Sequence, residues 1–262
     1  MRITLRVWTR GARIIVHVLF GLLLAAIVNL DFSGRLRPEP LTQRWMLRLL
    51  RILRVRCAVQ GSPASGTRLV VANHVSWLDI PLIAAAEPVR FVAKSEVRDW
   101  PLAGWLANAA GSFYIRRGKG GSRPLIERLV VHLATGGGSV VLFPEGTTTD
   151  GREVGSFHAR LFAAPVDAGV TVQPLALRYR PTADGREIAP FIGDDDLLSH
   201  ILRVLREPEL HAELVYCAPI SSCGQDRGAL AARSRAAVRE ALGLPPAPSS
   251  RPPRATSTAV AA

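Results

Sequence analysis

Acidic side chains are nearly absent from the first 60 residues of this 262-residue chain, where only Asp31 and Glu39 occur. The same stretch has eleven arginines, so it carries nine of the twelve net positive charges. These arginines alternate with leucine, isoleucine, valine and tryptophan, whereas a nucleic-acid-binding segment combines basic residues with polar and stacking aromatic ones. We therefore expect no nucleic-acid partner. The pattern favours an anionic membrane surface, to which each basic residue contributes about 1 kcal/mol.

Cysteine is also scarce. Cys57, Cys217 and Cys223 are odd in number and have no CxxC spacing, which argues against a disulfide framework and against a zinc site. We expect them to be small buried side chains in a reducing cytoplasm, and we expect no metal and no cofactor.

The length of the chain favours one compact domain with appendages at its ends. Hydrophobic residues make up 48% of the chain and its mean hydropathy is positive, so part of its apolar surface is expected to meet lipid. Residues 14–30 form an apolar run of seventeen residues that only His17 and Asn29 interrupt, close to the minimum of about 17 for a membrane span. The sequence after it offers no clear small-x-small cleavage site, so we interpret the run as a membrane anchor or re-entrant helix; a signal peptide and a buried core helix are the alternatives.

Residues 41–55 place their arginines on one side of a helix and Trp45, Leu49, Ile52 and Leu53 on another. This pattern is typical of a helix lying in the membrane interface. An ordinary amphipathic helix packed on the domain is the alternative, and both interpretations hold if the helix covers the domain and also dips into lipid.

Beyond residue 56 short apolar segments alternate with helical patterns, which predicts an α/β fold with a central mixed sheet flanked by helices. The predicted strands are 68–72, 89–93, 112–115, 139–143, 170–177 and 213–216, and the predicted helices include 80–86, 101–110, 123–134, 159–167 and 195–205. We divide the chain into an N-terminal membrane-associated helical segment (1–56), a single α/β domain (57–242) and a disordered tail rich in proline, serine and alanine (243–262).

The block NHVSWLD, residues 73–79, follows a predicted strand and precedes a predicted helix. Such junctions expose side chains at a sheet edge, where α/β proteins commonly place their sites. Imidazole is suited to removing the proton of an alcohol near neutral pH, and a carboxylate can hold the other ring nitrogen as its N–H tautomer. His74 and Asp79 are therefore the candidate catalytic pair. Taken alone, a histidine near an aspartate is more often a capping or hydrogen-bonded structural pair.

Three further blocks follow: GSFYIRR (111–117), FPEGTTT (143–149) and VQPLAL (172–177). In this order and at these separations, the four blocks resemble those of the glycerolipid (lysophospholipid) acyltransferase family, typified by bacterial 1-acylglycerol-3-phosphate acyltransferases. The resemblance covers about residues 66–180. It implies that His74 and Asp79 form the catalytic dyad of an O-acyltransferase, which transfers a fatty acyl group from an acyl thioester to the free hydroxyl of a lysophospholipid.

The resemblance also implies a set of substrate-binding residues. They are Asn73, Ser76, Phe113, Arg116, Glu145, Gly146 and Thr147. The guanidinium of Arg116 suits a phosphate, although a solvated arginine is the alternative. Gly146 and Thr147 lie in a tight turn that could bring N–H groups and a hydroxyl to an anion. Glu145 would repel an anion unless it binds the acceptor hydroxyl or Arg116, so its role comes from the family only.

One position departs from the family pattern. Arginine usually follows FPEGT, but this chain has Thr148 there. Removing a cation lowers the expected preference for a phosphate monoester, so acylation of a lysophosphodiester or a lyso-ornithine lipid by the same mechanism is the alternative to 1-acylglycerol-3-phosphate.

Two other functions compete with acyl transfer. A hydrolase or thioesterase would need a serine nucleophile, but the chain has no G-x-S-x-G elbow, and Ser76 is too close in sequence to His74. A non-catalytic membrane-binding protein would explain the basic helices but not the four blocks. We expect an acyl carrier protein or coenzyme A thioester as donor, and location at the inner (cytoplasmic) membrane with the catalytic domain facing the cytoplasm. The sequence leaves open whether the first helix spans the membrane, because basic residues flank it on both sides.

Overall fold

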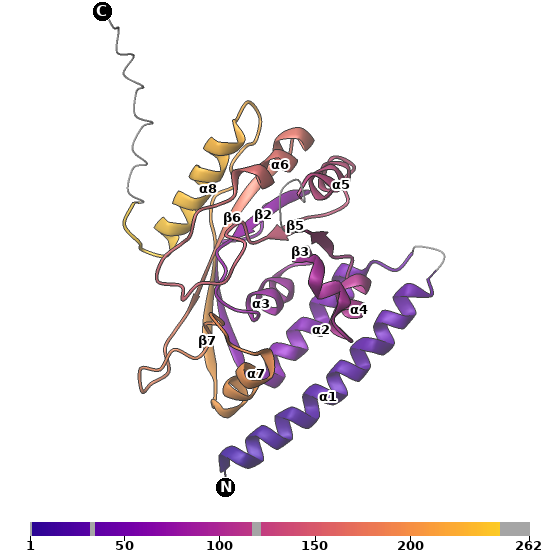
Figure 1. The fold of residues 1–262 in the computed structure, drawn as a ribbon, viewed down its shortest axis with the longest axis vertical. Helices are drawn as coiled ribbons and strands as arrows, with labels where there is room; N and C mark the ends of the chain where they lie inside the picture. The colour runs from indigo at the N-terminus through magenta and orange to yellow at the C-terminus, as the bar shows by residue number, and fades with distance from the viewer. Residues whose placement is uncertain (1, 32–34, 117–121, 247–262) are drawn as a thin grey trace, which may run out of the picture.

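The computed structural model describes residues 2–31, 35–116 and 122–246. Its centre is a seven-stranded sheet in the order β1-β7-β6-β2-β5-β3-β4 (Figure 1). All neighbouring strands are parallel except β6 and β7, so the sheet is mixed, as predicted. The strands are β1 (Val55–Gln60), β2 (Arg68–Ala72), β3 (Arg90–Lys94), β4 (Phe113–Ile115), β5 (Val140–Leu142), β6 (Thr171–Tyr179) and β7 (Leu210–Tyr216).

Helices cover both faces of the sheet, and the α/β prediction is thereby confirmed. The helices are α1 (Arg2–Asn29), α2 (Pro38–Leu53), α3 (Asp79–Ala86), α4 (Ala103–Ala109), α5 (Arg123–Ala134), α6 (Ala163–Ala168), α7 (Leu197–Arg206) and α8 (Arg227–Ala241), with 3-10 turns η1 (Ser95–Asp99) and η2 (Ala159–Phe162). One core cluster packs α2, α3 and α7 on one face, and a second packs α5, α6 and α8 on the other. β2 lies between them, since Val70 points into the first cluster and Val71 into the second.

Several elements differ from their predicted bounds. The helix expected over 41–55 ends at Leu53, because Arg54 adopts a left-handed conformation (φ 60°) and Val55 begins β1. β1 therefore starts two residues before the predicted domain boundary. Neither β1 nor α8 was predicted. Of the predicted tail, residues 243–246 form no helix or strand, and residues 247–262 lie outside the described part of the chain.

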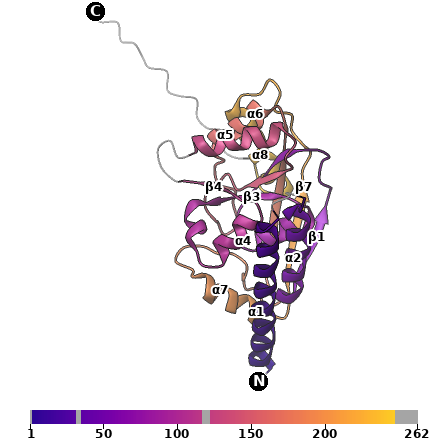
Figure 2. The same ribbon diagram turned by 90° about the vertical axis from the view of Figure 1, so that its right-hand side faces the viewer.

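α1 lies outside the two layers, beside α2, α4 and α7 (Figures 1 and 2). It is long and apolar enough to cross a membrane. Trp45 of α2 stacks on His17 of α1 with ring centroids 4.6 Å apart, and its indole N–H donates to the His17 carbonyl. A Cβ at Gly21 would lie 2.7 Å from the indole, so the glycine lets the two helices pack closely.

The N-terminal half of α1 is bound to the end of α7. Arg10, only 9% exposed, donates to the carbonyls of Glu207 (2.7 Å) and Pro208 (2.9 Å), and Arg6 donates to that of Arg206 (2.7 Å). The last carbonyls of a helix lack partners within it, so these arginines satisfy groups that burial would otherwise leave unbonded. The first turns of α1 are thus held against the α/β domain, at the C-terminal end of α7.

Candidate active site

His74 lies two residues beyond β2, at the carboxyl ends of the parallel strands. Its Nδ1 is 2.7 Å from Oδ2 of Asp79, the first residue of α3. An ionised carboxylate only accepts hydrogen bonds, so this contact keeps the proton of the neutral imidazole on Nδ1 and leaves a lone pair on Nε2. The ring stacks on Phe143, with centroids 4.0 Å apart, which fixes its plane. This is the geometry of a general base with an orienting carboxylate.

Asp79 is fully buried, and its carboxylate is surrounded by donors. Oδ2 also accepts the backbone N–H groups of Val75 (2.7 Å) and Ser76 (2.9 Å), while Oδ1 accepts the hydroxyl of Tyr179 (2.6 Å). These bonds replace the water that a buried charge loses. The carboxylate therefore holds the turn at residues 75–79 and also orients His74. The structural interpretation and the catalytic interpretation of the sequence pattern thus both apply to Asp79.

Tyr179, at the end of β6, was not among the predicted site residues. Burial, followed by the charge of Asp79, raises the pKa of Tyr179 well above its usual value. The phenol therefore stays protonated and remains a donor to the carboxylate.

Glu145 joins two backbone segments of the site. Its Oε1 accepts the N–H of His74 (2.8 Å) and its Oε2 accepts the N–H of Gly155 (2.6 Å). Burial raises the pKa of Glu145, and these two bonds oppose that shift. A Cβ at Gly155 would lie 2.7 Å from Oε2, so a side chain there would displace the carboxylate from its two N–H donors. Of the partners considered from the sequence, Arg116 is not one that the described residues give to this carboxylate.

Asn73 and Ser76 are fully buried behind the dyad. The Asn73 amide exchanges two hydrogen bonds with the backbone of Leu177 (3.0 and 2.8 Å), which ties the end of β2 to β6. The Ser76 hydroxyl has no partner among the described residues. Neither side chain lines the cavity described next, so the structure does not bring these two predicted substrate-binding residues to it.

A cavity of about 1210 Å³ opens beside His74. Its wall is mostly apolar and is built by α1, α2, β3, α4, η2 and the turn after β5. Of the dyad, only His74 lines the cavity, whereas the Asp79 carboxylate is buried behind it. A space of this size and character suits the acyl chains of lipid substrates.

Polar groups gather in the part of the wall formed by the predicted motifs. Arg116, Glu145, Gly146 and Thr148 all line the cavity. Gly146 adopts φ 72°, a left-handed conformation that favours glycine, and a Cβ there would lie 3.3 Å from Nε2 of His158. The Thr148 hydroxyl donates to the carbonyl of Phe191.

The two remaining predicted residues lie elsewhere. Thr147 is exposed and does not line this cavity. Phe113 is buried against His132, with ring centroids 5.1 Å apart, and lines a smaller pocket at the edge of the sheet.

Further side chains of the cavity were missed in the sequence, including Lys94, Arg160 and Trp77. Trp77 donates its indole N–H to Nδ1 of buried His200 (2.9 Å), whose Nε2 lies 3.1 Å from the carbonyl of Pro190. Burial lowers the pKa of His200, so its neutral ring can accept one bond and donate the other. No local pattern marks such a pair, because the two residues are 123 positions apart.

Comparison with known proteins bears on this site. A family model described as Acyltransferase matches residues 54–178. The chain is 46% identical to the lyso-ornithine lipid O-acyltransferase of Pseudomonas aeruginosa, over 91% of this chain and 94% of that protein. It is 35% identical to the lyso-ornithine lipid O-acyltransferase of Rhodobacter capsulatus, with 91% and 90% covered.

Two proteins that act on acylglycerol phosphates are also similar to this chain. It is 34% identical to the 1-acyl-sn-glycerol-3-phosphate acyltransferase of Neisseria meningitidis, with 65% of this chain and 68% of that protein covered. The crystal structure of the 1-acyl-sn-glycerophosphate acyltransferase PlsC from Thermotoga maritima matches with a TM-score of 0.67 over 92% of this chain and 96% of that one. At 21% identity, the structural match concerns the fold alone.

Proposed function

Since the chain belongs to the lysophospholipid acyltransferase family, it is an O-acyltransferase of lipid biosynthesis, and we propose that its acceptor is a lyso-ornithine lipid. The observation that carries this function is the imidazole of His74, which Asp79 holds by Nδ1 while the ring lines a large apolar cavity. Two observations support the acceptor. Thr148 stands in place of the family's arginine, and the chain is similar over most of its length to the lyso-ornithine lipid O-acyltransferases of Pseudomonas aeruginosa and Rhodobacter capsulatus.

The proposed reaction is a direct transfer. Nε2 of His74 takes the proton of the acceptor hydroxyl as its oxygen attacks the thioester carbonyl carbon. The C–O ester bond forms, the C–S bond breaks, and the imidazolium returns the proton to the departing thiolate. Asp79 stabilises the imidazolium between these steps, and Tyr179 and the Val75 and Ser76 N–H groups hold Asp79 in place.

The acceptor headgroup is expected to lie beside the motif residues. An ornithine headgroup carries one carboxylate and one ammonium, so it needs a wall of mixed charge. Lys94, Arg116 and Arg160 line this cavity together with Glu96 and Glu145. A doubly charged phosphate monoester would gain more from an arginine at position 148 than from a threonine.

The chain associates with a membrane, and we propose that it does so from the cytoplasmic side without crossing. Arg6 and Arg10 at the start of α1 are bound to the α7 end of the catalytic domain, whereas a spanning helix would carry them to the opposite side. Large apolar side chains are exposed along α1 and on its neighbours, including Trp8 (74%), Leu19 (60%) and Leu198 of α7 (68%). A face of this kind fits a helix lying in the interface.

The donor is proposed to be an acyl carrier protein or coenzyme A thioester, both of which are made in the cytoplasm. The test offers the purified protein acyl thioester with lyso-ornithine lipid or with 1-acylglycerol-3-phosphate, and mass spectrometry identifies the products. We expect the ornithine lipid to form several times faster. Faster formation of phosphatidic acid would identify the phosphate monoester as the acceptor instead.

A further inference from the structure

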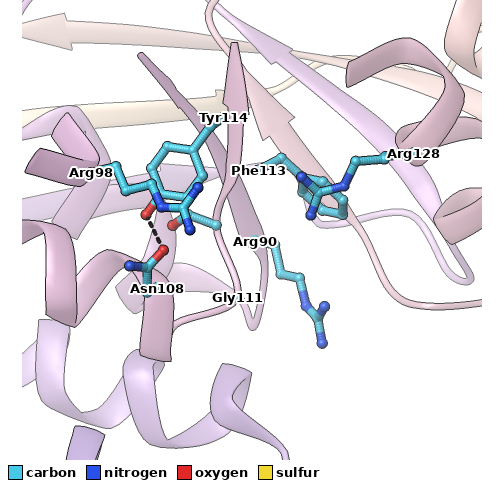
Figure 3. A pocket seen from close by; sticks show the side chains of 8 residues that line it. Arg90, Arg98, Asn108, Gly111, Phe113, Tyr114 and Arg128 are labelled. Carbon is cyan, nitrogen blue, oxygen red and sulfur yellow. Dashed lines mark hydrogen bonds between the residues drawn. The ribbon is translucent and has the colours of Figure 1, made fainter. Parts of the chain in front are cut away.

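A second pocket, of about 300 Å³, lies at the edge of the sheet against β4 (Figure 3). Three arginines line it: Arg90 of β3, Arg98 of η1 and Arg128 of α5. Ser112 lines both this pocket and the large cavity, so the two spaces meet at the segment that leads into β4. We refer to it as the edge pocket.

Two of the three guanidinium groups are held by aromatic rings of β4. The Arg98 Cζ is 6.0 Å from the ring centroid of Tyr114, and the Arg128 Cζ is 5.6 Å from that of Phe113. Figure 3 shows each guanidinium over its ring. Stacking uses the face of a guanidinium and leaves N–H groups at its edge to donate. Neither arginine has a carboxylate partner within the described residues, so both charges are available to an anion.

The remaining wall adds donors and a fixed shape. The Asn108 side-chain oxygen accepts the hydroxyl of Tyr114 (2.8 Å), which leaves its amide N–H groups for another partner. Arg90 is paired with Glu39 of α2 (2.6 Å), the one acidic side chain that contacts a lining arginine in the described ranges. Gly111 adopts φ 73°, and a Cβ there would lie 3.1 Å from Nε of Arg90, so the glycine admits that arginine.

We propose that the edge pocket binds a phosphate group of the acyl donor, through Arg98 and Arg128. This inference rests on the proposed function, and it places the donor's phosphate at the β4 edge of the sheet. Guanidinium forks and an amide suit phosphate oxygens. The phosphopantetheine arm of coenzyme A and of acyl carrier protein carries such a phosphate well away from the thioester, so a phosphate in the edge pocket leaves the thioester free to enter the neighbouring cavity.

The acceptor is a poorer occupant of this pocket. The hydroxyl to be acylated must reach His74, and the proposed ornithine headgroup has a carboxylate but no phosphate. The phosphate of a membrane phospholipid has the same chemistry as the donor's, and the experiment separates these two sources.

The test compares the wild-type protein with an Arg98→Ala/Arg128→Ala variant. Both arginines are exposed, so the fold should be retained. The matched control is Arg227→Ala/Arg233→Ala, which removes the same charge from exposed positions of α8, a helix that packs on β6 and η2. Initial rates are measured with acyl-coenzyme A, with acyl carrier protein thioester, and with acyl-pantetheine, which lacks phosphate.

We expect the KM for the phosphate-bearing donor that the protein uses to rise about tenfold or more in the edge-pocket variant. The rates with acyl-pantetheine and the KM for the acceptor should stay unchanged, and the α8 control should match the wild type. An unchanged donor KM, or an equal rise with acyl-pantetheine, overturns the proposal. If the variant instead loses only binding to phosphatidylglycerol vesicles, the pocket serves a lipid phosphate and the donor assignment is wrong.

Binding of free coenzyme A and of the phosphopantetheine-bearing carrier protein, measured by calorimetry, separates this inference from the proposed function. A wild-type protein that forms no acylated product disproves the function. Tighter binding of either ligand to the wild type than to the edge-pocket variant would still support the pocket, and equal binding of both would count against it.

Discussion

The hydroxyl of Tyr179 donates a 2.6 Å hydrogen bond to Oδ1 of Asp79, while Oδ2 of the same carboxylate contacts Nδ1 of His74. The end of β6 thus supports the dyad at the end of β2, although 100 positions separate Tyr179 from Asp79. The arrangement allows a change at β6 to affect the reaction without touching either substrate.

Replacing Tyr179 with phenylalanine should slow the reaction without weakening substrate binding. The variant loses the donor to Oδ1, so Asp79 holds the imidazole less firmly. We expect kcat to fall about tenfold, which corresponds to about 1.4 kcal/mol of transition-state stabilisation, with both KM values unchanged. Tyr216→Phe is the matched control, because that buried tyrosine lies near Glu87 and away from the dyad. Equal kcat values in the two variants would show that Tyr179 only packs the core.

Replacing Thr148 with arginine should change the preferred acceptor. The new guanidinium would line the cavity and pair with a phosphate monoester. We expect the ratio of kcat/KM for 1-acylglycerol-3-phosphate to that for lyso-ornithine lipid to rise about tenfold. Thr147→Arg provides the control, since that neighbour does not line the cavity. If Thr148→Arg and Thr147→Arg give the same ratio, residue 148 does not determine which acceptor is preferred.

His200 should make the protein less stable in acid. Its pKa is lowered in the folded protein, so between the usual histidine pKa and the lowered value the unfolded chain binds more protons. The free energy of unfolding is then highest above about pH 6.5 and falls as the pH decreases through this window. A His200→Gln variant should have a lower Tm at pH 7, because it loses the bonds to Trp77 and Pro190, but a smaller drop in Tm from pH 7 to pH 5. Parallel Tm profiles would assign the acid sensitivity to other groups.

Arg10 should hold the first half of α1 against the domain. In Arg10→Ala the carbonyls of Glu207 and Pro208 lose a charged donor, a type of bond that contributes about 1.5 to 3 kcal/mol. We expect faster amide hydrogen exchange in the first turns of α1, measured in detergent or on vesicles. Arg13→Ala is the control, since Arg13 is exposed. Exchange that is as slow in Arg10→Ala as in the control would mean that other contacts dock α1.

Sequence patterns predicted the parts of the fold that are locally encoded. β2 was found because RLVVA is a short apolar run, and its five residues are all buried. β1 was missed because VRCAVQ is an edge strand with mostly exposed side chains. Its arginine also continues the arginine-rich pattern of the preceding helix. α8 was missed because RGALAARSRAAVREA has only a weak apolar stripe.

The same distinction holds for the site. His74 and Asp79 are five positions apart, so a single strand-to-helix junction is enough to bring them together. Tyr179, His200 and the backbone partners of Glu145 reach the site only through tertiary packing, and no local pattern marks them. Asn73 and Ser76 belong to the same block as the dyad but are buried. Asn73 is bound to the backbone of Leu177, and Ser76 lies in the turn whose N–H groups bind Asp79.

The most direct test of the proposed mechanism compares acyl transfer by wild-type, His74→Ala and His158→Ala proteins with lyso-ornithine lipid and an acyl thioester, with the product quantified by mass spectrometry. His158 is an exposed histidine of the same cavity, so it controls for loss of an imidazole there. We expect His74→Ala to lower the rate by about 10² to 10⁴, while His158→Ala stays within about tenfold of the wild type. A His74→Ala protein that keeps near-normal turnover would show that this imidazole is not the general base.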